Sequence, residues 1–122
     1  MSNVCPNLDF RSEMPHRLDH GIGMVGAGGV VNYAHLPAYA KAGFKVVAIM
    51  DKDCQRAEQT AGAHKIPKVY STVEELVRDP EVVDIAVYPW EALAIAEQVM
   101  RAGKHLLCQK PVSEEYRKAA RV

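Results

Sequence analysis

Short apolar runs alternate along the chain with stretches in which apolar residues recur at helical spacing. The apolar runs predict strands at residues 22–25, 45–50, 69–70, 82–88 and 105–108. The stretches between them predict helices at about 30–42, 54–63 and 91–102, a short helix after Ser71 and a last helix after Ser113. Strict alternation of strands and helices is typical of βαβ units around a parallel sheet. We therefore expect an α/β fold with a doubly wound parallel sheet.

Residues near the expected helix ends carry start and stop signals. Gly43 and Gly103 each follow a helix and predict its C-terminal end. Ser71 and Glu74 have the S-x-x-E spacing of a capping box, and Ser113 predicts the cap of the last helix. In doubly wound sheets, ligands bind at the carboxyl ends of the strands near the point where the strand order reverses. We expect the ends of the first, fourth and fifth strands to surround one crevice.

Two glycine patterns compete at the first strand. The segment GIGMVG matches G-x-G-x-x-G but lies inside the strand, whereas a phosphate-binding loop must follow the strand and open a helix. The segment GAGGVV, which begins at Gly26, meets that requirement. Its backbone N–H groups would face a pyrophosphate, and the candidate binding residues are Gly26, Ala27, Gly28, Gly29 and Val30. A glycine-rich turn that binds nothing would have the same sequence.

Asp51 stands at the end of the second strand, where a carboxylate can accept hydrogen bonds from the diol of an adenosine ribose. Together with the glycine loop, this residue favours a dinucleotide ligand. Its charge would repel a 2′-phosphate, so NAD is favoured over NADP, although Lys52 would partly offset the repulsion. A helix N-cap at Asp51 is the structural alternative.

Four segments, taken together, resemble a known family: GIGMVGAGGVVNYAHLPAY, VVAIMDKD, STVEELVRDPEVVDIAV and AGKHLLCQKPVS. In this order they are similar to the nucleotide-binding half of the Gfo/Idh/MocA oxidoreductases, the group of glucose–fructose oxidoreductase and inositol dehydrogenase. The resemblance implies a Rossmann domain at residues 20–122, preceded by an N-terminal tail at 1–19. It also implies an NAD(P)-dependent enzyme that transfers hydride between nicotinamide and a sugar, a polyol or a related secondary alcohol.

The resemblance assigns a catalytic role to Lys110. In the family, the lysine of an E-K-P segment after the fifth strand sits by the nicotinamide, binds substrate and relays its proton. Oxidation of an alcohol requires removal of the hydroxyl proton as hydride leaves, so a lysine suits this position. Here the segment reads Gln109-Lys110-Pro111, and Gln109 can still hydrogen-bond to a ribose. A solvated lysine at a strand end is the alternative.

The chain departs from the family pattern after the fourth strand and at its C-terminal end. The turn reads YPWEAL where the family has T-P-N followed by a histidine, so Trp90 replaces the asparagine and Leu93 stands near the histidine. Pro89 and Trp90 are the candidate residues of the cofactor site here, and Trp90 could equally pack within the loop. The second α/β domain, which binds substrate in the family, is absent from these 122 residues. We expect a truncated chain, with any homo-oligomer formed through the missing domain.

Charge and composition restrict the partners. Fifteen basic and fifteen acidic residues give a formal net charge of zero, which offers no electrostatic reason for binding nucleic acid or an anionic membrane. No apolar run is long enough to span a membrane, and residues 1–19 lack the apolar core of a signal peptide, so we expect a cytoplasmic protein. The three cysteines and five histidines show no metal-ligand spacing, so we expect no metal.

Two functions besides the dehydrogenase stay open. A nucleotide-binding regulatory or interaction module without catalysis is favoured by the absent domain and the altered turn around Trp90. An S-adenosylmethionine methyltransferase also has a glycine loop and an acidic residue after the second strand. The Q-K-P segment argues against the methyltransferase.

Overall fold

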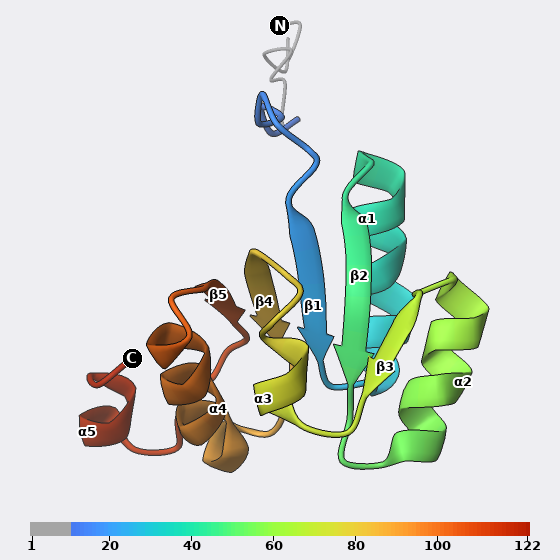
Figure 1. The fold of residues 1–122 in the computed structure, drawn as a ribbon. Helices are drawn as coiled ribbons and strands as arrows, with labels where there is room; N and C mark the ends of the chain where they lie inside the picture. Colours follow the sequence, from blue (N-terminus) through green and yellow to red (C-terminus); the bar gives the residue numbers. More distant parts are fainter. Residues whose placement is uncertain (1–10) are drawn as a thin grey trace, which may run out of the picture.

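The computed structural model describes residues 11–122 and consists of one parallel sheet with helices on both faces (Figure 1). The first ten residues of the expected tail lie outside this range, and residues 11–20 contain no helix or strand. The strands are β1 (Gly21–Val25), β2 (Lys45–Met50), β3 (Lys68–Tyr70), β4 (Val82–Ile85) and β5 (His105–Cys108). They pair in parallel in the order β3-β2-β1-β4-β5. This is the strand order of a Rossmann fold and confirms the expected fold class.

Helical segments connect the strands. They are the π-helical turn η1 (Val31–His35), α1 (Leu36–Ala42), α2 (Cys54–His64), α3 (Val73–Leu76), α4 (Pro89–Arg101) and α5 (Tyr116–Ala119). The side chains of neighbouring residues in β1 lie on opposite faces of the sheet. Met24 packs in one apolar cluster with Leu36 of α1, and Val25 packs in the other with Leu76 of α3. Two apolar layers therefore enclose the sheet. No helix within residues 11–122 is long and apolar enough to cross a membrane.

The order in which successive strands are added to the sheet reverses at β1. From β1 the chain proceeds outward through β2 and β3, whereas β4 returns to the other side of β1 and β5 continues outward (Figure 1). The turn after β1 is anchored to both neighbours, because Gly26 N donates to Met50 O and Ala86 N donates to Val25 O, each at 2.8 Å. The expected crevice lies at this reversal point.

The largest differences from the predicted element boundaries lie on either side of the turn between β4 and α4. β4 ends at Ile85 and not at residue 88, because the last residues of its neighbours β1 and β5 pair with Ile85 and the ladder stops there. α4 begins at Pro89 and not at residue 91, since proline is well suited to the first position of a helix.

Two predicted caps are wrong. α3 is capped by Thr72, whose Oγ1 accepts a hydrogen bond from Glu75 N at 3.2 Å, and not by Ser71 with Glu74. The N-cap of α5 is Glu115, while Ser113 lies three residues before the helix and its Oγ accepts from Glu115 N at 3.2 Å. The C-terminal stop at Gly43 is confirmed, with a left-handed φ of 85°.

Candidate functional site

A crevice of about 510 Å³ lies at the carboxyl ends of the strands. Its volume falls within the range of small-molecule sites. The walls come from the loop after β1, the tip of β2, the start of α4 and the segment after β5. The predicted site residues that line it are Gly26, Gly28, Val30, Asp51, Lys52, Gln109 and Lys110. Those that do not line it are Ala27, Gly29, Pro89 and Trp90.

Gly26 is required by the geometry of the turn after β1. Its φ is +109°, and a Cβ added there would lie 2.3 Å from the carbonyl oxygen of Ala86. The backbone of the loop therefore passes directly over the end of β4, where no side chain fits.

Gly28 and Ala27 have different roles in the same loop. A Cβ added at Gly28 would meet no atom within 4 Å, so its backbone faces the open crevice. Ala27 is buried, and its N–H donates to Asp51 Oδ2 at 2.8 Å. Gly28 and the exposed Val30 thus present the loop to a ligand, while Ala27 joins the loop to β2.

Asp51 connects the glycine loop with the start of α2. Besides the contact with Ala27, Oδ1 accepts from Asp53 N at 2.8 Å and from Arg56 Nη2 at 2.9 Å. The residue is only 7% exposed. Burial alone would raise the pKa of Asp51, but the hydrogen bonds from Arg56, Asp53 N–H and Ala27 N–H outweigh burial and hold the pKa below its ordinary value. The carboxylate is therefore ionised at neutral pH.

The N-cap of α2 is Asp53, so the alternative interpretation of Asp51 as a helix cap is wrong. Asp53 has an extended backbone, and its Oδ1 accepts from Arg56 N at 3.2 Å. Each oxygen of a carboxylate can accept about two hydrogen bonds. Oδ1 of Asp51 accepts two and Oδ2 accepts one, so Oδ2 has room for a further donor from a ligand in the crevice.

Three polar residues that the sequence analysis did not select also line the crevice: Arg56, Tyr88 and Glu91. Glu91 Oε1 lies 2.7 Å from Lys52 Nζ, so an ion pair joins α4 to the tip of β2. Arg56 lies in the first turn of α2 and faces Asp51. The sequence signal for Arg56 was its position one helical turn after an N-cap aspartate.

Asn32 supports the glycine loop from the first helical segment and was also missed. Its Nδ2 donates to the carbonyl oxygens of Ala27 and Gly28 at 3.1 and 2.9 Å. The same nitrogen lies 3.1 Å from Thr60 Oγ1, and Asn32 Oδ1 lies 3.2 Å from His64 Nε2. Asn32 thus supports the loop from behind and ties it to α2.

Tyr88 and Trp90 form a stacked pair at the start of α4. Their ring centroids are 4.6 Å apart and the rings are nearly parallel, at 6°. Trp90 is 62% exposed, so it is neither buried in the core nor part of the crevice wall. Of the two rings, Tyr88 lines the crevice.

Gln109 and Lys110 line the crevice from the segment that follows β5. Gln109 N donates to Ile85 O at 3.1 Å, which extends the pairing of β4 and β5 by one residue. Lys110 is exposed, and its side chain has no hydrogen-bond or ion-pair partner within the part of the chain that the structure describes. The Lys110–Pro111 peptide bond is cis.

A buried polar group lies outside the crevice, between the first helix and β4. Asp84 Oδ2 accepts from Tyr39 Oη and lies 2.7 Å from His35 Nδ1. Burial, followed by the hydrogen bond to Asp84, raises the pKa of Tyr39. The side chain of His35 is mostly buried, and its contact with Asp84 helps to hold the helix against the sheet.

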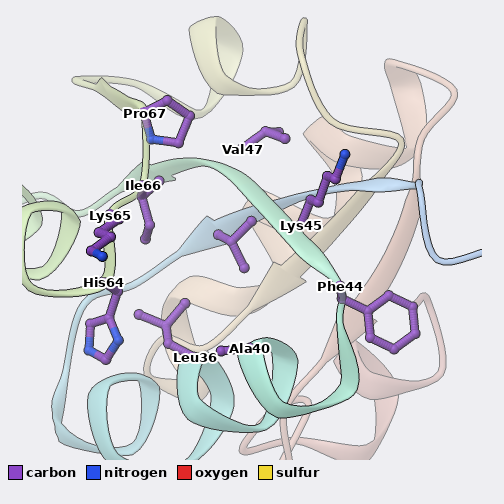
Figure 2. A pocket seen from close by; sticks show the side chains of 10 residues that line it. Leu36, Ala40, Phe44, Lys45, Val47, His64, Lys65, Ile66 and Pro67 are labelled. Atoms are coloured by element: carbon purple, nitrogen blue, oxygen red, sulfur yellow. The ribbon is translucent and has the colours of Figure 1, made fainter.

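A second hollow of about 380 Å³ lies between α1, β2 and the segment after α2 (Figure 2). Apolar side chains such as Leu36, Val47 and Ile66 form most of its wall, with Lys45 and His64 among its polar residues. It contains none of the predicted site residues. Within residues 11–122, no three His, Cys, Asp or Glu side chains gather so as to hold a metal ion.

Comparison with known proteins connects this geometry to an enzyme family. Residues 20–122 match the sequence model of the Gfo/Idh/MocA group, described as an oxidoreductase family with an NAD-binding Rossmann fold. A relative is trans-1,2-dihydrobenzene-1,2-diol dehydrogenase of Oryctolagus cuniculus, 39% identical over 79 residues. The match covers 63% of this chain and 24% of the rabbit protein.

Solved structures show the same fold. An oxidoreductase from Thermotoga maritima superposes with a TM-score of 0.77 at 30% identity, covering 82% of this chain and 32% of that one. UDP-N-acetylglucosamine 3-dehydrogenase from Acidithiobacillus ferrooxidans gives a TM-score of 0.77 at 25% identity, with coverages of 86% and 34%. The chain thus spans about a quarter to a third of the length of these proteins.

Proposed function

The chain belongs to the oxidoreductase family with an NAD-binding Rossmann fold, and from this premise we propose that residues 20–122 form the dinucleotide-binding domain of a dehydrogenase. The proposed reaction transfers hydride between nicotinamide and a secondary alcohol of a small sugar, polyol or diol. The observation that carries the proposal is one crevice lined by Gly28, Asp51 and Lys110, from three different strand ends.

The proposed cofactor is NAD, and the crevice has features that fit it. The open backbone at Gly28 can approach a pyrophosphate, because no neighbouring atom occupies the space beside it. The remaining acceptor site on Asp51 Oδ2 can bind a ribose hydroxyl. Gln109, at the end of β5, can hydrogen-bond to the second ribose. When bound, the nicotinamide ring accepts or returns the hydride.

The proposed catalytic residue is Lys110. Oxidation of an alcohol requires removal of the hydroxyl proton as hydride leaves for the nicotinamide. The neutral amine of Lys110 would accept that proton, and the resulting ammonium would return it to the oxygen in the reverse reaction. Its exposed side chain, without a partner in the described range, is able to turn toward a substrate. The names of the relatives support the substrate class, since one acts on a dihydrobenzene diol and another on a nucleotide sugar.

A non-catalytic nucleotide-binding module is the second candidate. The exposure of Lys110 favours it, because nothing in the described range holds this side chain in a reactive position. Both candidates require the same nucleotide site, so binding is the first property to measure.

The test is calorimetric titration of the 122-residue chain with NAD, NADP and S-adenosylmethionine. Gly28→Ala places a methyl group in the crevice, and we expect it to weaken NAD binding by roughly tenfold or more, since it obstructs the approach of the pyrophosphate. Gly62→Ala is the matched control, because its added Cβ also meets nothing within 4 Å but lies on α2 and does not line the crevice.

Three results would contradict the proposal. One is the absence of binding by a chain shown to be folded by circular dichroism. Another is binding of S-adenosylmethionine in place of NAD. The third is equal NAD affinity in Gly28→Ala and Gly62→Ala.

A further inference from the structure

Two cations stand at the tip of β2, and each is paired with a carboxylate. Lys52 Nζ lies 2.7 Å from Glu91 Oε1, and Arg56 Nη2 lies 2.9 Å from Asp51 Oδ1. All four residues line the crevice. Asp53, the cap of α2, adds a third carboxylate next to them. The cluster therefore has three negative and two positive charges.

We propose that Glu91 is a specificity-determining residue that selects NAD over NADP by holding Lys52. This inference rests on the proposed function, because it presupposes that the crevice binds a nicotinamide dinucleotide. NADP differs from NAD by a 2′-phosphate on the adenosine ribose, which in Rossmann domains lies near the tip of the second strand. Glu91 belongs to α4, far from that tip in sequence, and reaches it only through the fold.

The position of Glu91 is fixed by the start of α4. Pro89 occupies the first position of the helix, and Glu91 N donates to Tyr88 O at 2.9 Å, so the residue lies in the first turn. A carboxylate is stabilised there by the helix dipole. The Glu91 side chain is 30% exposed, which leaves it partly enclosed by the crevice wall.

Lys52 is held by this contact and otherwise faces solvent. Its side chain is 65% exposed, and the hydrogen bond that it donates to Glu91 is the main cause that raises its pKa. A 2′-phosphate would have to compete with the Glu91 carboxylate for this ammonium. It would also meet the negative charge of Asp51, whose own cation, Arg56, is already engaged. Removal of the Glu91 charge frees Lys52 and leaves the cluster with no net charge.

The experiment compares the Kd values of NAD and NADP for the wild-type chain and for Glu91→Gln, Lys52→Gln and the double variant. We expect Glu91→Gln to lower the ratio of the NADP Kd to the NAD Kd by about tenfold, through tighter NADP binding, because a freed lysine forms a charge-assisted hydrogen bond with the phosphate. The double variant, which also lacks the Lys52 ammonium, should not bind NADP more tightly than the wild-type chain does. Glu97→Gln is the matched control, since Glu97 is on the same helix and pairs with Arg121, outside the crevice.

The outcomes separate this inference from the function on which it rests. A Kd ratio within twofold of wild type in Glu91→Gln, with NAD still bound, would overturn the inference alone. An equal loss of affinity for NAD and NADP in Glu91→Gln would also overturn the inference, since it would indicate a structural role for Glu91. A gain that persists without Lys52 would also overturn it. If the folded wild-type chain bound neither nucleotide, the proposed function and the inference would both fail.

Discussion

The carboxylate of Asp51 joins three parts of the crevice wall. It accepts hydrogen bonds from the loop after β1 through Ala27 N–H, from the start of α2 through Asp53 N–H, and from the Arg56 guanidinium. A buried carboxylate with charge-assisted hydrogen bonds is stabilising only while it is ionised. The stability of the fold therefore depends on the protonation state of this group.

Asp51→Asn tests that dependence. The pKa of Asp51 in the folded chain lies below its ordinary value, so its contribution is complete above the pKa of the unfolded chain and is lost as the pH falls through the folded-state pKa. We expect the variant to lose about 1–3 kcal/mol of unfolding free energy at pH 7. The difference from wild type should narrow below about pH 4. Urea denaturation at a series of pH values measures this difference in unfolding free energy. A difference that does not change with pH would contradict the stabilising role of the ionised Asp51 carboxylate.

Gly26→Ala tests the strain at the turn after β1. The added methyl group would collide with Ala86 O, and the positive φ is unfavourable for alanine, so we expect a loss of about 3 kcal/mol or more. Gly43→Ala is the control, because Gly43 also has a positive φ of 85° but its nearest neighbour, Leu18, is 3.7 Å away. That variant should lose about 1–2 kcal/mol. Equal losses in thermal or urea unfolding would show that the contact with Ala86 is unimportant.

At the scale of elements, the start of α3 provides a test of capping. Thr72 Oγ1 accepts from Glu75 N, and Glu75 Oε2 accepts from Ser71 N at 3.3 Å. We expect Thr72→Ala to lower the unfolding free energy by about 1 kcal/mol, since one N–H of the first turn loses its acceptor. Ser71→Ala should change it by less than about 0.5 kcal/mol, because its hydroxyl caps nothing here. A larger loss in Ser71→Ala, measured by urea denaturation, would reverse the assignment.

Residues 71–75, at the start of α3, show why some element boundaries could not be predicted from the sequence. STVEE contains both S-x-x-E and T-x-x-E, and local chemistry does not distinguish the two frames. The buried side chains of Val73 and Leu76 decide between them, because they must face the core. The strands and their class were predictable since apolar runs bounded by glycine, proline or aspartate define them locally. The end of β4 depended instead on where its neighbours stop.

The part of the candidate site that lies at the carboxyl ends of the strands was predictable from the sequence. Gly26 and Asp51 directly follow β1 and β2, and Gly28 lies in the loop after β1, so their meeting at one edge of the sheet follows from the fold class. Asn32 and Glu91 were missed because their roles depend on how helices cross the sheet. The spacing of residues along a helix does not reveal which strand tip it approaches.

At the scale of the whole molecule, the sheet has two edge strands. They are β3 and β5, and each carries an exposed apolar side chain, Val69 on β3 and the more exposed Leu107 on β5. No helix within residues 11–122 covers Leu107, which is 50% exposed. An open strand edge next to an exposed apolar side chain is a surface on which another strand can pair.

The central position of β1 has a consequence for the order in which the fold is assembled. β1 pairs with β2 and with β4, and its pairing with β4 joins Ile22 to Val82, 60 positions apart. Each neighbouring pair in the sheet is joined through a helical connection and not through a hairpin, so chain entropy is lost before the pairing compensates for it. We expect refolding after dilution from urea to take milliseconds to seconds in stopped-flow fluorescence, and a time below about 100 μs would contradict this. On a ribosome, β1 emerges first among the strands but gains its second neighbour only after Ile85 has been added, so one side of the central strand stays open until then.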